Sequence, residues 1–253
     1  MRLADSIFLR IIVLLASALS TLWFVSHPSF YGWLFLVIGI ASVWIAFTVF
    51  TKKMLKWSLV NYAFTPILLW TGTLSIILFT PKGFYQIAFI ALTTFLSFIW
   101  ATTLTYNVTM SDAFVFRGNL LSYINTFIIF FISSSLYAYF IFISFHSLAV
   151  FLAFPVITFI LISHILRASH LLWKDIRPHL FTSTLIITEA FIAVVFIPTT
   201  FWVKGFLITV IFYIVAGIAR CSLTSILTLK IIKRYLIWGS LIIFGILISA
   251  PWQ

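Results

Sequence analysis

Glu189 lies deep inside an apolar stretch of the chain, where a carboxylate is out of place. It interrupts the run LIITEAFIAV, Leu185 to Val194, and the whole sequence contains only 4 acidic residues. A charge at the centre of a bilayer costs about 2.5–3.5 kcal/mol on insertion scales, so we expect Glu189 to face the interior of a helix bundle or a cavity and to have a partner. Arg220, in the next apolar segment, is the best partner by predicted depth. The pattern is typical of a structural ion pair, of a proton- or ligand-binding carboxylate, or of a catalytic acid.

A second group of ionisable side chains lies in the stretch SHILRASHLLWKDIRPHL, residues 163–180. We interpret it as a cytoplasmic loop that faces anionic lipid phosphates, with a metal site or a partner-docking loop as alternatives. The HExxH spacing, which aligns two metal ligands over one helical turn, is absent. The candidates in this stretch are His164, His170, Asp175, Arg177 and His179.

Several kinds of chemistry lack their sequence signatures. The chain has no GxxxxGK loop, which excludes an ATP-hydrolysing module within it, and no paired aspartates for magnesium pyrophosphate. Its one cysteine, Cys221, allows neither an intramolecular disulfide nor a zinc site built from thiolates. We therefore predict no catalytic residue, no metal site and no cofactor.

The elements that carry these residues are predicted to be membrane-spanning helices. The chain has 253 residues, of which 64% are hydrophobic and 8% charged, whereas soluble domains are about 25% charged. A span needs about 20 apolar residues, and continuous apolar runs exclude the alternating pattern of a membrane barrel. The predicted fold is an all-α, polytopic transmembrane helix bundle within a single domain, 1–253. Its nine expected spans are Ile7–Val25, Phe30–Phe50, Leu59–Thr80, Phe84–Thr105, Leu120–Ile143, Ser147–Leu166, Leu180–Ile197, Val203–Thr228 and Tyr235–Ala250.

Lysine and arginine predict the orientation of these spans, because the cytoplasmic loops of membrane proteins are enriched in both. With the N-terminus in the cytoplasm, only Lys82 and Lys204 of the inter-span basic residues fall outside. We therefore expect a cytoplasmic N-terminus, an external C-terminus and a location in a prokaryotic cytoplasmic membrane. The net charge of +11 then reflects orientation and attraction to anionic headgroups, and we expect no nucleic-acid partner.

An internal repeat is suggested by the segments FTPILLWTGTLSIILFTP, residues 64–81, and FTSTLIITEAFIAVVFIP, residues 181–198. Phe64 matches Phe181 and Pro81 matches Pro198, and the register continues into the following helix. A true duplication would give parallel halves, 7–105 and 120–228, followed by a final helix, 235–250. Chance similarity in a chain with 30 phenylalanines is the alternative.

Three classes of function fit these residues. The leading one is a carrier or permease for a small molecule or ion, with Glu189 as its buried ionisable site and Arg220 as its partner. The second is a non-catalytic, membrane-embedded subunit or scaffold of a larger complex, because the loops are too short to form a functional domain outside the membrane. The third is a lipid-active membrane enzyme. The sequence does not decide whether the chain is an enzyme and favours a protein that is not one.

Overall fold

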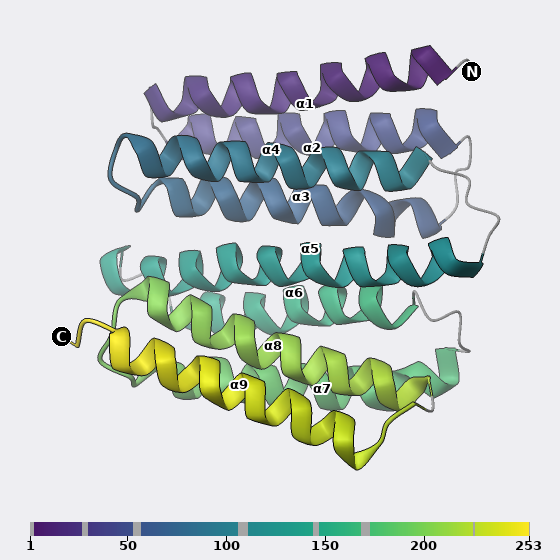
Figure 1. Ribbon diagram of the computed structural model, residues 1–253. Helices are drawn as coiled ribbons and strands as arrows, with labels where there is room; N and C mark the ends of the chain where they lie inside the picture. Colours follow the sequence, from purple (N-terminus) through teal and green to yellow (C-terminus); the bar gives the residue numbers. More distant parts are fainter. Residues whose placement is uncertain are drawn as a thin grey trace. The chain divides into compact units, whose positions relative to one another are not determined.

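The computed structural model describes residues 3–26, 30–52, 57–105, 111–143, 147–167, 173–224 and 226–252. Over these residues the regular structure is helical (Figure 1). The exception is an isolated antiparallel bridge between Thr199 and Trp252. A π-helical turn, Tyr139–Ile143, continues α5. The α-helices are α1 (Leu3–Ser26), α2 (Phe30–Lys52), α3 (Trp57–Ile77), α4 (Phe84–Thr105), α5 (Ser111–Ala138), α6 (Ser147–Arg167), α7 (Trp173–Val195), α8 (Phe201–Leu223) and α9 (Leu229–Ser249).

Six of the described helices are long and apolar enough to cross a membrane, which indicates a helical membrane protein. The described parts of α1, α2 and α3 contain shorter apolar stretches, so the expected count of nine spans stays a prediction. The six candidate spans are Phe84–Thr102, Leu120–Ile143, Val150–Arg167, Trp173–Val195, Phe201–Leu223 and Leu229–Ser249.

Several helix boundaries differ from those expected, and two of these differences matter for the site. α7 begins at Trp173, well before the predicted start at Leu180, and α8 ends at Leu223 rather than Thr228. Hydropathy marks where apolar residues stop, whereas a helix ends where its backbone hydrogen bonds stop. Basic residues are good helix formers, so a helix can continue through a polar, basic stretch beyond the apolar part of its sequence.

The helices form two compact units, Met1–Arg117 and Gly118–Gln253. In the first unit α1 packs against α2 and α4, and α3 packs against both α2 and α4, which closes a ring. Trp44 and Trp70 are fully buried in it. A hydrogen bond of 2.7 Å between the Thr73 and Thr93 hydroxyls joins α3 to α4.

In the second unit α7 packs between α6 and α8, and α9 packs against α8. Side chains connect α5 to its neighbours: the Asn125 amide donates to the Leu161 carbonyl of α6 at 3.4 Å, and the Tyr137 hydroxyl donates to the Phe191 carbonyl of α7 at 2.8 Å. On α9 only Gly239 is buried among the residues that the structure describes. This helix therefore adds little to the core of its unit.

In the hairpins α3–α4 and α7–α8, a side chain of the second helix donates a hydrogen bond to a carbonyl group at the end of the first helix. Gln86 of α4 donates to the Ile77 carbonyl at 3.1 Å, and Lys204 of α8 donates to the Val195 carbonyl at 2.9 Å. The last carbonyls of a helix lack partners within it, and a cation there also suits the helix dipole. These two pairs lie one residue out of the register that matches Phe64 with Phe181, so the expected duplication stays a prediction.

Helices α5 and α8 approach closely because Gly205 has no side chain. A Cβ atom added at Gly205 would collide with Ser134, whose hydroxyl group already fills that space. The neighbouring Ser133 hydroxyl donates to the Gly205 carbonyl at 3.4 Å. Small residues permit this close packing between membrane helices.

We predict that Gly205→Leu lowers the stability of the protein by about 1–3 kcal/mol, because the added side chain overpacks the α5–α8 contact. Gly39→Leu is the matched control, since a Cβ atom at Gly39 would have no neighbour within 4 Å. The measurement is thermal unfolding of the purified protein in detergent. Equal unfolding temperatures for the two variants would contradict the described contact.

Candidate functional site

The rotation of α7 is set by an aromatic stack on its buried face. The Phe191 ring lies 3.9 Å from that of Phe154 on α6 and 4.5 Å from that of Tyr137 on α5, measured between centroids. Both pairs are stacked, and stacked aromatic pairs contribute about 0.5–1.5 kcal/mol beyond the area they bury. The buried residues of α7 are Ile176, Leu180, Ser183, Thr184, Ile187, Phe191 and Val194.

Glu189 lies on the opposite, exposed face of this helix. Residues two positions apart in an α-helix point in nearly opposite directions, so burial of Phe191 turns Glu189 outward. The side chains around the carboxylate on this face are mostly large and apolar. They include Leu185, Ile186, Ile192 and Phe196, of which Phe196 is 81% exposed.

The expected ion pair between Glu189 and Arg220 is not formed. No hydrogen bond or ion pair to the Glu189 carboxylate is found among the residues that the structure describes. At 1.5 Å per residue, Glu189 lies about 24 Å from the start of α7, whereas Arg220 lies about 5 Å from the end of α8. Because the two helices are joined by a short hairpin and pack side by side, these residues stand at very different depths. The shifted helix boundaries account for the error.

The second group of candidates is helical where it was expected to form a loop. His164 is buried on α6, and Asp175, Arg177 and His179 lie in the first two turns of α7, with Pro178 inside the helix. Proline has a φ angle suited to a helix, but at this position, beyond the first turn, it removes one hydrogen bond of the helix. His170 lies outside the described residues. Within this group the structure brings Arg167 and Arg177 together at the ring of Trp173, with Cζ-to-centroid distances of 4.4 and 5.6 Å.

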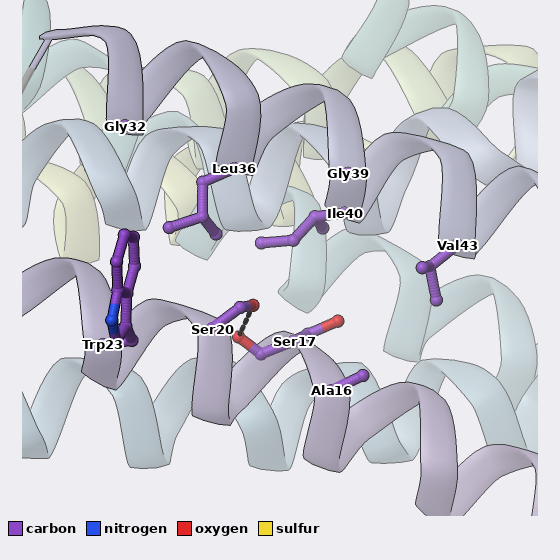
Figure 2. A pocket seen from close by; sticks show the side chains of 9 residues that line it. All are labelled: Ala16, Ser17, Ser20, Trp23, Gly32, Leu36, Gly39, Ile40 and Val43. Carbon is purple, nitrogen blue, oxygen red and sulfur yellow. Dashed lines mark hydrogen bonds between the residues drawn. The ribbon is translucent and has the colours of Figure 1, made fainter.

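A pocket of about 440 Å³ lies between α1 and α2 (Figure 2). Figure 2 shows Leu36 and Ile40 of α2 facing Ser17, Ser20 and Trp23 of α1 across it. Both serine hydroxyls donate to carbonyls of their own helix, those of Val13 at 2.9 Å and Ser17 at 3.1 Å. The lining is therefore nearly all apolar, which suits hydrocarbon and offers little to hold a polar solute.

The described part of the chain contains no group of three or more His, Cys, Asp or Glu side chains that could hold a metal ion. Comparison with protein families, with curated proteins and with solved structures finds no match for this chain. The class that the structure defines is therefore an all-helical protein with long apolar spans, and its function must be argued from its own residues.

Two features of the site were missed in the sequence. The Phe154–Phe191–Tyr137 stack could not be singled out among 30 phenylalanines. The Trp173–Arg177 contact did leave a signal, because residues four apart on a helix are neighbours. Arg167 gave no such signal, since its approach to Trp173 depends on how α6 packs against α7.

We predict that Glu189 reacts with dicyclohexylcarbodiimide, a carboxyl reagent that dissolves in lipid. The reagent dissolves in the apolar part of the membrane and reacts with carboxyl groups that it reaches there, and Glu189 is exposed within an apolar span. Mass spectrometry of the digested protein should find the adduct on the peptide with Glu189 and lose it in Glu189→Gln. A water-soluble carbodiimide should prefer Asp175, which is exposed in the first turn of α7. Absence of the Glu189 adduct would mean that this face is shielded.

Proposed function

We propose that the chain is a membrane-embedded subunit of a larger assembly, and that a transmembrane helix of a partner protein binds along the exposed face of α7. The observation that carries the proposal is the placement of Glu189: exposed, within an apolar span, and without a hydrogen bond or ion pair among the described residues. A carboxylate in contact with lipid would cost about 2.5–3.5 kcal/mol or more. A donor from a partner helix at the same depth removes this penalty.

The chemistry of the face defines the partner. It needs a lysine, an arginine or a side-chain amide opposite Glu189, since those groups donate to a carboxylate. Ala190 and Ala193 lie beside Glu189 on the half-buried and exposed sides of α7. Small residues let two helix backbones approach closely in a membrane. The surrounding large side chains, Leu185 and Ile192, are 60% and 41% exposed and would pack against the same helix.

The carrier hypothesis has weaker support. It requires a polar cavity that reaches Glu189, whereas the pocket between α1 and α2 is apolar and lined by other helices. What favours it is the similar hydrogen bond at the ends of the two hairpins, from Gln86 and from Lys204, because carriers are often built from repeated halves. A lipid-active enzyme has no supporting cluster of acids and histidines among the described residues.

The orientation that we propose has the basic ends of α6, α7, α8 and α9 in the cytoplasm, which follows the positive-inside rule. In the second unit every lysine and arginine except Lys204 lies at or near this end. A cytoplasmic membrane with an anionic inner surface suits this arrangement.

We predict that gentle purification from native membranes yields a stoichiometric membrane-protein partner with the wild type and much less of it with Glu189→Leu, which removes the acceptor. Glu189→Gln keeps a hydrogen-bonding side chain and should retain an intermediate amount. Quantitative mass spectrometry of the purified samples measures all three.

Asp175→Asn is the matched control, because it removes an exposed carboxylate from the same helix outside the apolar face. It should leave the amount of partner unchanged. The subunit proposal would be contradicted, and a carrier favoured, by a wild-type protein that purifies without a protein partner but retains a small molecule, if Glu189→Gln loses that molecule. A crosslink from the α7 face only to another part of the same chain would also contradict it.

A further inference from the structure

Two arginines at the basic end of the second unit share one aromatic ring. Trp173 begins α7, and Arg167 ends α6. The guanidinium carbon of Arg167 lies 4.4 Å from the centroid of the Trp173 ring, and that of Arg177 lies 5.6 Å from it. Both distances fall within the range of about 6 Å for a cation–π contact. Both guanidinium groups therefore contact the same indole ring.

Within the described part of the chain, the hydrogen-bonding capacity of both arginines is unused. Each guanidinium carries five N–H donors, and none of them has a hydrogen bond or an ion pair among the described residues. Asp175, the acidic residue in the first turn of α7, makes no ion pair with either arginine. Two positive charges on one ring repel each other, so an anion that contacts both would stabilise the arrangement. Phosphate accepts paired N–H bonds from arginine with good geometry.

The surroundings extend the positive field. Lys174 is exposed beside the two arginines, and the first backbone N–H groups of α7 lack partners within the helix and favour negative charge. Lys230, Lys233 and Arg234 begin α9 at the same end of the unit (Figure 1). These residues attract an anion in general, whereas the Arg167–Trp173–Arg177 group provides a defined position for it.

An apolar surface leads from this group toward the middle of the spans. Phe181 follows Arg177 by one turn of α7, and its ring lies 5.6 Å from the ring of Phe159 on α6, measured between centroids. Phe181 is 62% exposed. A free phosphate ion would gain nothing from this surface, but the acyl chains of a lipid would lie along it.

We propose that Arg167, Trp173 and Arg177 form a binding site for the phosphate of an anionic glycerophospholipid, whose acyl chains contact Phe159 and Phe181. The two arginines donate hydrogen bonds to the phosphate, and the phenylalanines distinguish a lipid from a soluble phosphate. This site is separate from the Glu189 face in depth and in chemistry. The lipid proposal therefore does not depend on whether a partner protein binds beside Glu189.

The test is lipid binding to the delipidated, full-length protein in detergent, followed by native mass spectrometry during titration with phosphatidylglycerol or phosphatidylcholine. The wild type should bind phosphatidylglycerol in preference to phosphatidylcholine. Arg167→Gln/Arg177→Gln should weaken phosphatidylglycerol binding by about tenfold or more, because it removes both charge-assisted contacts. Arg167→Lys/Arg177→Lys keeps the charge but loses the planar donors, so it should restore only part of the affinity.

Lys230→Gln/Lys233→Gln is the matched control, since it removes the same charge from the same end of the unit without touching Trp173. It should change the affinity by about twofold or less, because distant exposed charges are screened. An equal loss in the control and in the arginine variant would overturn the proposal in favour of diffuse attraction. Displacement of the lipid by an equal concentration of glycerol phosphate would overturn the part assigned to Phe159 and Phe181. If the glutamine variant does not fold, the lysine variant and the control still decide between these outcomes.

Discussion

Hydrocarbon cannot solvate a charge or an unpaired hydrogen-bonding group, and the described structure is organised around this constraint. Most of its buried or half-buried hydroxyls bond to a carbonyl one turn earlier in their own helix, as Ser17 does to Val13 and Thr184 to Leu180. Lys204 is buried, but its amine group donates to the end of α7. Glu189 departs from this pattern, which is why it carries the functional argument.

The exposure of Glu189 depends on residues that have no functional chemistry of their own. Phe154 and Tyr137 stack on Phe191, and the Tyr137 hydroxyl bonds to the Phe191 carbonyl. Three helices, α5, α6 and α7, meet at this point. Once Phe191 is fixed in the interior, the helical repeat leaves Glu189 no position except the outer face. A packing interaction therefore decides where the carboxylate is available to bind.

Helix α7 presents two kinds of chemistry along its length. Its first turns carry Trp173 and Arg177, which suit a lipid phosphate at the membrane surface. Its second half carries Glu189 on an apolar face, which suits a donor on a partner helix. The two sites need opposite charges at different depths, so a single helix can position a lipid and a protein partner without competition between them.

The sequence by itself determined the class of protein and the residues worth attention. Long apolar runs predicted a helical membrane fold because each helix satisfies its own backbone in lipid, and the scarcity of acids pointed to Glu189. The number of spans, the orientation and the duplication stay predictions. Only the tertiary structure decided which way Glu189 faces, why it does not meet Arg220, and that Arg167 shares Trp173 with Arg177. In helices that are apolar on nearly all sides, composition carries little information about rotation or about where a helix ends. Those properties arise from side-chain stacking and close packing between neighbouring helices.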